Sequence, residues 1–230
     1  MPSISAVLPA YNEEGNLART VGELVPVLAR TCEAYEVVVV NDGSTDRTAA
    51  VAERLAAQMP AVRVVHHARN LGYGSALRTG FGAATLEWIL LLDADGQFDP
   101  RDLDDFVTAA GAADLVLGYR ERRADAAHRG WFAVAWRYLM RILLGVRARD
   151  IDCAFKLMRA SLIRSLGLES GGAFISAELL AKAGRRGARV VEVPVSHRPR
   201  LHGTQTGGNP RVLVRAFYEL GRLWWRVRRF

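Results

Sequence analysis

The chain has 230 residues, 50% of them hydrophobic, and a net charge of +7 with a pI near 10. This length allows one large core, and we expect a single domain. The basic charge, carried mostly by arginine, favours anionic partners such as nucleotides, lipid phosphates or membrane surfaces. Only Cys32 and Cys153 occur, without a paired-cysteine spacing. A disulfide framework or a cysteine metal site is therefore not expected, and a reducing compartment fits.

The amino terminus shows no positive region followed by an apolar one, so no signal peptide is predicted. No uncharged apolar run approaches the roughly 20 residues of a spanning helix. We therefore expect a cytoplasmic protein that is at most peripheral on the cytosolic face of a membrane.

The first two predicted units each consist of a strand, a polar turn and a helix. The first runs from a strand at 4–8 through the turn 9–14 into a helix that reaches Leu28, with Asn12 as the expected N-cap. The second has a β-branched strand at 36–40, the polar turn 41–46 and a helix at 47–58. Polar groups therefore follow both strands at their carboxyl ends.

The same alternation continues through a strand at 62–65, a loop at 66–74, a helix to Ala84 and the apolar run that ends at Asp93. Strands alternating with helices predict βαβ units and an α/β fold with a mainly parallel sheet. The ligand crevice of such a sheet lies at the carboxyl ends of its strands.

After a helix that follows Pro100, a further strand at 114–118 completes a predicted sheet half, residues 1–120. The second half, residues 121–208, is expected to carry an apolar helix at 131–144, a helix at 176–183 and a strand at 189–195. The segment 150–158 receives no secondary-structure assignment. We expect this half to form the acceptor side of a site.

Asp93 and Asp95 follow the buried run that begins at Trp88, and Gln97 comes two residues later. Two carboxylates and an amide are hard oxygen ligands that suit Mg²⁺ or Mn²⁺, and such ions often bind substrate phosphates as well. The alternative is an ordinary turn, because Asp and Gly are turn residues in any case.

Four motifs in this order resemble the inverting glycosyltransferases of family 2, which have the GT-A fold. They are Pro9-Ala-Tyr11-Asn-Glu13, Asn41-Asp42-Gly-Ser-Thr-Asp46, Asn70-Leu-Gly72-Tyr-Gly74-Ser-Ala76 and Asp93-Ala-Asp95-Gly-Gln97. Within the family, Asp152-Cys-Ala-Phe155-Lys156 and Arg200-Leu-His-Gly203 are similar to the dolichol-phosphate mannose synthase type. The resemblance implies a GT-A domain with a Rossmann-like mixed sheet over residues 1–208.

The resemblance implies a nucleoside-diphosphate sugar as donor and a divalent metal at Asp93, Asp95 and Gln97. It implies donor contacts at Pro9, Tyr11, Glu13, Val40, Asp42, Gly72, Asp93, Ala94, Asp95, Gln97 and Arg200. The loop 70–76 is no Rossmann or Walker loop, because it lacks Gly-x-Gly-x-x-Gly at a first βα turn and a Gly-Lys-Ser/Thr ending.

For catalysis the resemblance implies Asp95, Asp152, Arg120, Arg129 and Arg200. Arg120 and Arg129 match positions that hold an acceptor phosphate, and Arg200 matches an arginine near the diphosphate. A lipid phosphate is already a nucleophile near neutral pH, because its second pKa is about 6. Asp152 would act as base only on a hydroxyl acceptor, and a structural aspartate in a turn is the alternative.

Residues 209–230 are predicted to form a basic amphipathic helix. Arg211, Arg215, Arg222, Arg226 and Arg229 lie on one side, and Leu213, Phe217, Leu220, Trp224 and Val227 on the other. This pattern is typical of a helix at an anionic membrane surface. The alternatives are a helix docked on the protein by its apolar side and a homodimer contact.

The sequence thus favours inverting transfer of a hexose from a UDP- or GDP-sugar to a polyprenyl phosphate at the cytosolic membrane face. One alternative is a family 2 transferase that acts on a hydroxyl of a soluble or glycan acceptor. Another is a nucleotide-sugar-binding module without turnover, which the intact metal motif argues against. Nucleic acid is not expected as a partner, because the basic residues are not interleaved with exposed aromatics.

Overall fold

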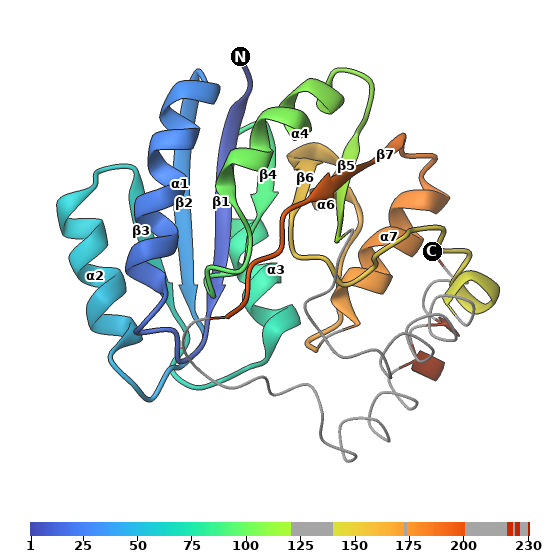
Figure 1. Cartoon of the computed structure of the whole chain (residues 1–230). Coiled ribbons are helices and arrows are strands. Elements are labelled where there is room, and N and C mark those ends of the chain that lie inside the picture. The colour runs from blue at the N-terminus through green and yellow to red at the C-terminus, as the bar shows by residue number, and fades with distance from the viewer. Residues whose placement is uncertain (121–139, 173, 201–219, 223, 226–229) are drawn as a thin grey trace.

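A computed structural model of the chain shows a seven-stranded sheet with helices on both faces (Figure 1). The structure describes residues 1–120, 140–172, 174–200, 220–222, 224–225 and 230. The strands are β1 (Ser3–Ala10), β2 (Ala34–Asn41), β3 (Val62–His66), β4 (Trp88–Leu91), β5 (Leu115–Arg120), β6 (Lys156–Arg159) and β7 (Val190–Val195). The helices are α1 (Leu17–Thr31), α2 (Thr48–Gln58), α3 (Tyr73–Ala83), η1 (Pro100–Asp102), α4 (Leu103–Ala110), α6 (Ala160–Ser165) and α7 (Ile175–Arg185).

The sheet has the order β3-β2-β1-β4-β6-β5-β7. Six strands run parallel, and β6 runs antiparallel between β4 and β5. The predicted α/β fold with a mainly parallel mixed sheet is confirmed. Strands from both predicted halves of the chain belong to this one sheet.

Strand β6 begins within the segment 150–158, for which the sequence predicts no secondary structure. It has only four residues and begins with Lys156, so neither length nor an apolar start marks it as a strand. Its pairing with β4 and β5 comes from residues far away in the chain, which a local pattern does not reveal.

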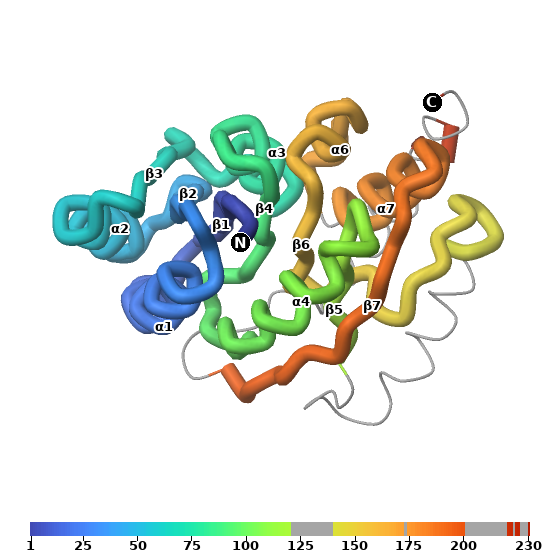
Figure 2. Tube along the Cα trace, turned by 90° about the horizontal axis from the view of Figure 1, so that it is seen from above, coloured from blue at the N-terminus to red at the C-terminus, as the bar shows by residue number. Residues whose placement is uncertain are grey.

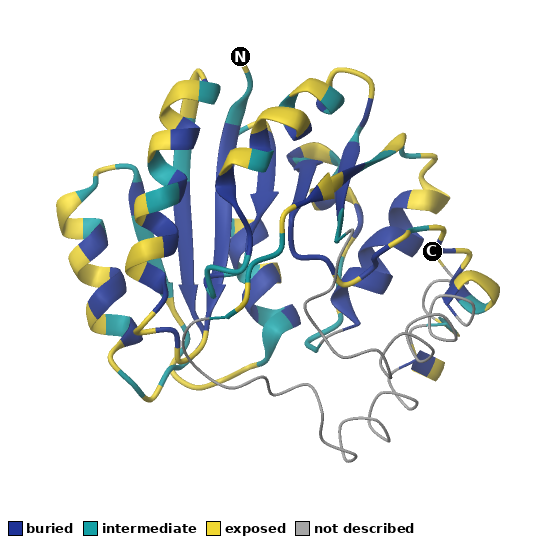
Figure 3. Cartoon of the chain, in the orientation of Figure 1, coloured by how far each residue is buried: buried dark blue, intermediate teal, exposed yellow. Residues whose placement is uncertain are grey.

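Alternate residues of β2 enter two different cores, because successive strand side chains point to opposite faces. Val37 and Val39 pack with α1, α2 and α4, whereas Val38 and Val40 pack with α3, α6 and α7. Figure 2 shows α1 and α4 on one side of the sheet and α3 and α6 on the other. The central strands are therefore buried on both faces (Figure 3), as near-continuous apolar strands of parallel sheets are.

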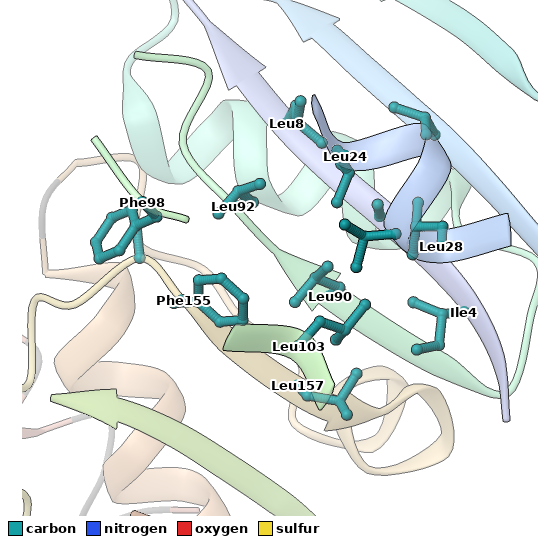
Figure 4. Packing of buried hydrophobic residues seen from close by; sticks show 14 of the residues in the cluster. Ile4, Leu8, Leu24, Leu28, Leu90, Leu92, Phe98, Leu103, Phe155 and Leu157 are labelled. Carbon is teal, nitrogen blue, oxygen red and sulfur yellow. The ribbon is translucent and has the colours of Figure 1, made fainter. Parts of the chain in front are cut away.

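The core on the α1 and α4 side extends to the segment that follows β4 (Figure 4). The Phe155 ring lies 4.6 Å from the ring of Phe106 and 6.0 Å from that of Phe98, between ring centroids. Phe155 directly precedes β6, so these rings join the segment that follows β4 to the second half of the chain.

The first helix begins later than predicted, and Asn12 is not its N-cap. Helix α1 starts at Leu17 with Asn16 in the cap position, and Asn12 has a positive φ of 57°. Oδ1 of Asn12 instead accepts the N–H of Thr45 at 2.8 Å. Short polar side chains tolerate this left-handed conformation and bind nearby backbone. The turn after β1 therefore stays open, and Glu13 lies in it rather than inside a helix.

The described part of the predicted C-terminal helix packs on the protein. Leu220 is 4% exposed, and Trp224 is partly buried in the same core on the α7 side. Trp225 is 51% exposed. This agrees with the docked alternative at the two apolar positions that are described. Within the described ranges, no helix is long and apolar enough to cross a membrane.

Candidate active site

The turns that follow β1, β2 and β4 surround a cavity of about 700 Å³. These parallel strands bring their carboxyl ends to one edge of the sheet, so residues from separate motifs meet there. The cavity is lined by Pro9, Ala10, Tyr11, Asn12, Glu13, Asp42, Asn70, Gly72, Tyr73, Ala76, Asp93, Ala94, Asp95 and Arg200. Nine of the predicted donor contacts are among them. We call this cavity the donor pocket.

Asp93 and Asp95 enter the donor pocket directly after β4. Oδ1 of Asp93 accepts a hydrogen bond from the hydroxyl of Tyr73 at 3.1 Å, and Oδ1 of Asp95 accepts the N–H of Gln97 at 3.1 Å. Burial and the charge of Asp95 raise the pKa of Asp93 well above its ordinary value. A divalent cation would relieve this repulsion, and the oxygen donors fit Mg²⁺ or Mn²⁺.

Within the described residues, no group of three or more His, Cys, Asp or Glu side chains is arranged to hold a metal. The pair therefore needs ligands from elsewhere, and substrate phosphates usually complete such shells. Gln97 is not part of the pocket lining, since its amide donates to the carbonyl of Arg198 at 3.2 Å. Its assignment as a metal ligand stays a prediction.

Arg200 joins the two acidic turns across the pocket. Its Nη2 forms an ion pair with Oε1 of Glu13, and its Nη1 lies 3.5 Å from Oδ2 of Asp95. Glu13 also accepts a hydrogen bond from the amide of Asn16 at 2.7 Å. Burial raises the pKa of Glu13 in spite of these two partners. The sequence indicated Arg200 and Glu13 separately, but their contact is visible only in the fold.

Asp42 fixes the loop that forms the next wall of the pocket. Its two carboxylate oxygens accept the N–H groups of Leu71 and Gly72, each at 2.9 Å. Oδ1 also lies 2.6 Å from Nδ1 of His67, whose Nε2 lies 2.9 Å from the hydroxyl of Thr79. Asp42 is therefore both a lining residue and the anchor of the loop 70–72.

Tyr11 and Pro9 supply apolar surface to the lining of the pocket. The side chain of Tyr11 is exposed to 43%, which is unusual for packing and suits a platform for a planar base. Val40, by contrast, is 0% exposed and packs in the core on the α3 side. The predicted donor contact of Val40 is thus not a lining side chain.

The predicted acceptor residues do not line the donor pocket. Arg120 forms a two-pronged ion pair with Asp150, with Nε–Oδ2 and Nη2–Oδ1 distances of 2.7 and 3.0 Å. Asp152 is exposed, two residues further on. Arg129 lies outside the described residues. The fold brings β5 and the segment before β6 together, which places Arg120 near the turn that carries Asp152.

Lys156 is a buried cation that the site predictions did not include. It is 1% exposed, and its ammonium donates to the carbonyls of Ile151, at 3.2 Å, and Cys153. Burial lowers the pKa of Lys156. A lysine inside the apolar sequence that leads into β6 was the available signal. The ammonium of Lys156 thus binds the backbone on both sides of Asp152.

The glycosyl transferase family 2 model matches residues 5–167. Glycosyltransferase AglD of Haloferax volcanii is 35% identical over 97% of this chain and 37% of its own length. The undecaprenyl-phosphate 4-deoxy-4-formamido-L-arabinose transferase of Edwardsiella ictaluri is 33% identical over 94% of this chain and 66% of its own length.

Among solved structures, glucosyl-3-phosphoglycerate synthase of Mycobacterium tuberculosis in complex with UDP is similar, with a TM-score of 0.74. The match covers 98% of this chain and 80% of that one, at 20% identity, and it supports the fold. The chain spans about two thirds or less of the length of the two curated relatives. The family match covers all four motifs at the pocket, and the chain therefore belongs to glycosyl transferase family 2.

Proposed function

We propose that this chain transfers a hexose, with inversion, from a UDP- or GDP-sugar to a polyprenyl phosphate. The observation that carries the proposal is the donor pocket, in which the carboxylates after β4 face Arg200. A nucleoside diphosphate needs both a cation site and a fixed positive side chain for its phosphates. The pocket offers both at the carboxyl edge of the sheet.

Each part of the donor has a matching group in the pocket. Tyr11 and Pro9 give the base an apolar surface, and Asp42 gives the base or ribose a carboxylate. Gly72 lines the pocket with its backbone, in a conformation with a φ of 95° that glycine adopts without strain. Arg200 would hold the diphosphate.

Asp93 and Asp95 would hold Mg²⁺ or Mn²⁺, with Gln97 as a further predicted ligand. When bound, the ion neutralises negative charge on the departing nucleoside diphosphate. The chain's own residues would orient the leaving group: Arg200 would contact the phosphates, and its Nη1 lies 3.5 Å from Oδ2 of Asp95, next to the proposed cation site.

The acceptor side rests on Arg120 and Arg129, with Asp152 nearby. A phosphate with a second pKa of about 6 is largely ionised near neutral pH, so it attacks without a strong base. The relative from Edwardsiella ictaluri carries undecaprenyl phosphate in its name, which supports a lipid phosphate as acceptor here. Arg120 would keep its ion pair with Asp150 and present its remaining N–H groups.

A lipid acceptor requires access to a membrane, and we propose peripheral association with the cytosolic face through the basic residues of 209–230. Each basic residue near an anionic surface contributes about 1 kcal/mol. Packing of Leu220 and Trp224 on the protein leaves electrostatic attraction and the exposed Trp225 as the means of binding. A homodimer contact is the competing use of this segment.

A second candidate is transfer to a hydroxyl of a soluble or glycan acceptor. The observation that favours it is the exposed Asp152, which is accessible to act as a base. If the acceptor is a hydroxyl, Asp152→Asn should abolish turnover. If the acceptor is a lipid phosphate, the same variant should keep most of its turnover.

The test is a transfer assay with purified chain, Mn²⁺ or Mg²⁺, labelled UDP- and GDP-hexoses and a short polyprenyl phosphate. We expect label to move into the lipid phosphate with inverted anomeric configuration, detected by NMR. Arg129→Ala should raise KM for the lipid phosphate far more than KM for the donor, with the exposed Arg30→Ala as control. Transfer to a glycan hydroxyl and none to the lipid would favour the second candidate.

A further inference from the structure

Two loops that are distant in the sequence pack backbone to backbone beside the donor pocket. We call residues 70–75 the donor loop and residues 169–172 the support loop. The N–H of Ser75 donates to the carbonyl of Gly171 at 3.2 Å. A Cβ at Gly72 would lie 2.7 Å from that carbonyl oxygen, and one at Gly74 would lie 2.7 Å from the carbonyl oxygen of Gly172. No side chain fits between the loops, so displacement of one moves the other.

A buried carboxylate of α7, that of Glu178, binds the backbone of the support loop. Oε2 of Glu178 accepts the N–H of Ser170 at 2.8 Å, and Oε1 accepts the N–H of Glu169 at 3.1 Å. Oε1 also lies 2.8 Å from the ammonium of Lys182, which donates to the carbonyl of Gly167 at 2.8 Å. Glu178 is 0% exposed and Lys182 2%.

Glu178 is ionised in this environment. Burial raises its pKa, but hydrogen bonds from Lys182 and Ser170 outweigh burial and bring the pKa below its ordinary value. Backbone N–H groups bind an ionised acceptor about twice as strongly as a neutral one. The charged oxygens therefore fix the start of the support loop more firmly than an amide would.

The position of the donor loop affects the shape of the donor pocket. Its Asn70, Gly72 and Tyr73 line the cavity. The N–H of Gly72 binds Asp42, and the hydroxyl of Tyr73 binds Asp93. Both the wall beside Asp42 and the contact to Asp93 thus depend on where the donor loop lies.

We infer that Glu178, paired with Lys182, is a positioning residue for the nucleotide-sugar, although α7 contributes no side chain to the donor pocket. The inference rests on the proposed function. Glu178 holds the support loop, the support loop holds the donor loop through Gly171, and the donor loop shapes the wall that meets the donor.

The first test is Glu178→Gln, which keeps the shape but turns an NH₂ donor toward a backbone N–H. The affinity for UDP with Mn²⁺, measured by calorimetry, should fall about 2- to 30-fold, the range of couplings carried through packed networks. KM for the nucleotide-sugar should rise in parallel, while KM for the lipid acceptor stays unchanged. A residue that only stabilises the fold would not raise KM for the nucleotide-sugar while leaving KM for the lipid acceptor unchanged.

The matched control is Glu36→Gln, the same exchange at a carboxylate that binds Ser5, Arg63 and Thr85 away from the pocket. We expect it to lower stability and leave the UDP affinity unchanged. An equal loss of UDP affinity in both variants would mean that general destabilisation is the cause, which overturns the inference.

If Glu178→Gln does not fold, the double variant Glu178→Leu/Lys182→Met removes both buried charges. Replacing a buried ion pair by apolar residues is often tolerated or stabilising. The N–H groups of Glu169 and Ser170 still lose their acceptor, so the UDP affinity should fall as before. A folded variant of either kind with unchanged UDP affinity would contradict the positioning role.

Amide hydrogen exchange separates this inference from the proposed function, because it needs no ligand. In the folded variant, the amides of Leu71 and Gly72 should exchange at least about threefold faster than in the parent chain, since weaker support favours local opening. Absence of UDP and GDP binding in the parent chain would count against the proposed function alone. Unchanged exchange would count against the role of Glu178.

Discussion

Nη1 of Arg200 lies 3.5 Å from Oδ2 of Asp95, which stands in the turn that follows β4. The two residues are more than one hundred positions apart, and β7 carries the chain back so that they meet. The same guanidinium pairs with Glu13 in the turn after β1. One cation thus holds two acidic turns at the place where a diphosphate would lie.

Arg200→Ala should weaken UDP binding by about 10- to 100-fold, because a hydrogen bond to a charged group contributes about 1.5–3 kcal/mol. Arg200→Lys should retain part of the affinity, since it keeps the charge but loses the two-pronged geometry. Calorimetry with UDP and Mn²⁺ measures both. Arg30→Ala, which removes an exposed ion pair with Asp104, is the control and should bind UDP normally.

Asp95→Asn tests the metal site. It keeps the size of the side chain but removes one negative charge from the proposed cation site, so turnover should fall about 100-fold or more while the protein stays folded. Titration with Mn²⁺ should show a matching loss of metal affinity. The exposed Asp104→Asn should behave like the parent chain. Full turnover of a folded Asp95→Asn variant in the presence of a chelator would refute the metal role.

Gly72→Ala and Gly82→Ala form a matched pair on and beside α3. Gly72 has a φ of 95° and a carbonyl oxygen 2.7 Å from the position of an added Cβ, so alanine should shift the donor loop and weaken UDP binding severalfold. A Cβ added at Gly82 would have no neighbouring atom within 4 Å. Alanine at this helical position should therefore raise the free energy of unfolding by about 0.5–1 kcal/mol. Chemical denaturation and calorimetry compare the two. Equal UDP affinity in both variants would show that the donor loop tolerates the shift.

Glu36 should make stability depend on pH in the acidic range. Burial raises its pKa, but hydrogen bonds from Ser5, Arg63 and Thr85 outweigh burial and lower the pKa to about 2. The unfolded chain has the ordinary value of 4.5, so the stabilisation is fully present above that pH. It is lost as the pH falls from about 4.5 toward 2.

Glu36→Gln should therefore cost roughly 2–3 kcal/mol at pH 7 and little near pH 2. Urea denaturation at several pH values measures the difference. The exposed Glu33→Gln is the control, and its free energy of unfolding should follow that of the parent chain at every pH. A constant difference between Glu36→Gln and the parent chain across this range would contradict the prediction.

Variants of Leu220 and Trp225 distinguish two roles of the C-terminal segment, packing on the protein and binding to a membrane. Leu220→Ala should lower the free energy of unfolding by about 2–5 kcal/mol, because the side chain is 4% exposed in the core. Trp225→Ala should leave stability nearly unchanged and weaken co-sedimentation with anionic vesicles, since its side chain is 51% exposed. Vesicle binding should also weaken with salt. Salt-insensitive binding would count against recruitment by the basic residues.

Local patterns were sufficient for most of the strand and helix assignments. The β-branched run before Asn41 and the apolar run before Asp93 are buried strands because both faces of the sheet are covered, and such burial is visible in composition alone. The turn motifs identified most residues around the donor pocket, because parallel strands bring their carboxyl ends, and the turns that follow them, to one edge of the sheet. The start of α1 was misplaced, because the side chain of Asn12 binds the backbone of Thr45 instead of capping a helix.

The sequence by itself determined the family, the βαβ order and the acidic pair Asp93 and Asp95, since these depend on residues close together in the chain. Only the tertiary structure decided that Arg200 reaches Asp95, that β6 inserts antiparallel between β4 and β5, and that Glu178 holds the loop against which Gly72 packs. Apart from the contact of Glu178 with Ser170, which spans eight positions, these contacts join segments about 40 to more than 100 residues apart. Their energies come from burial and from pairing of charges across the fold, which no local pattern encodes.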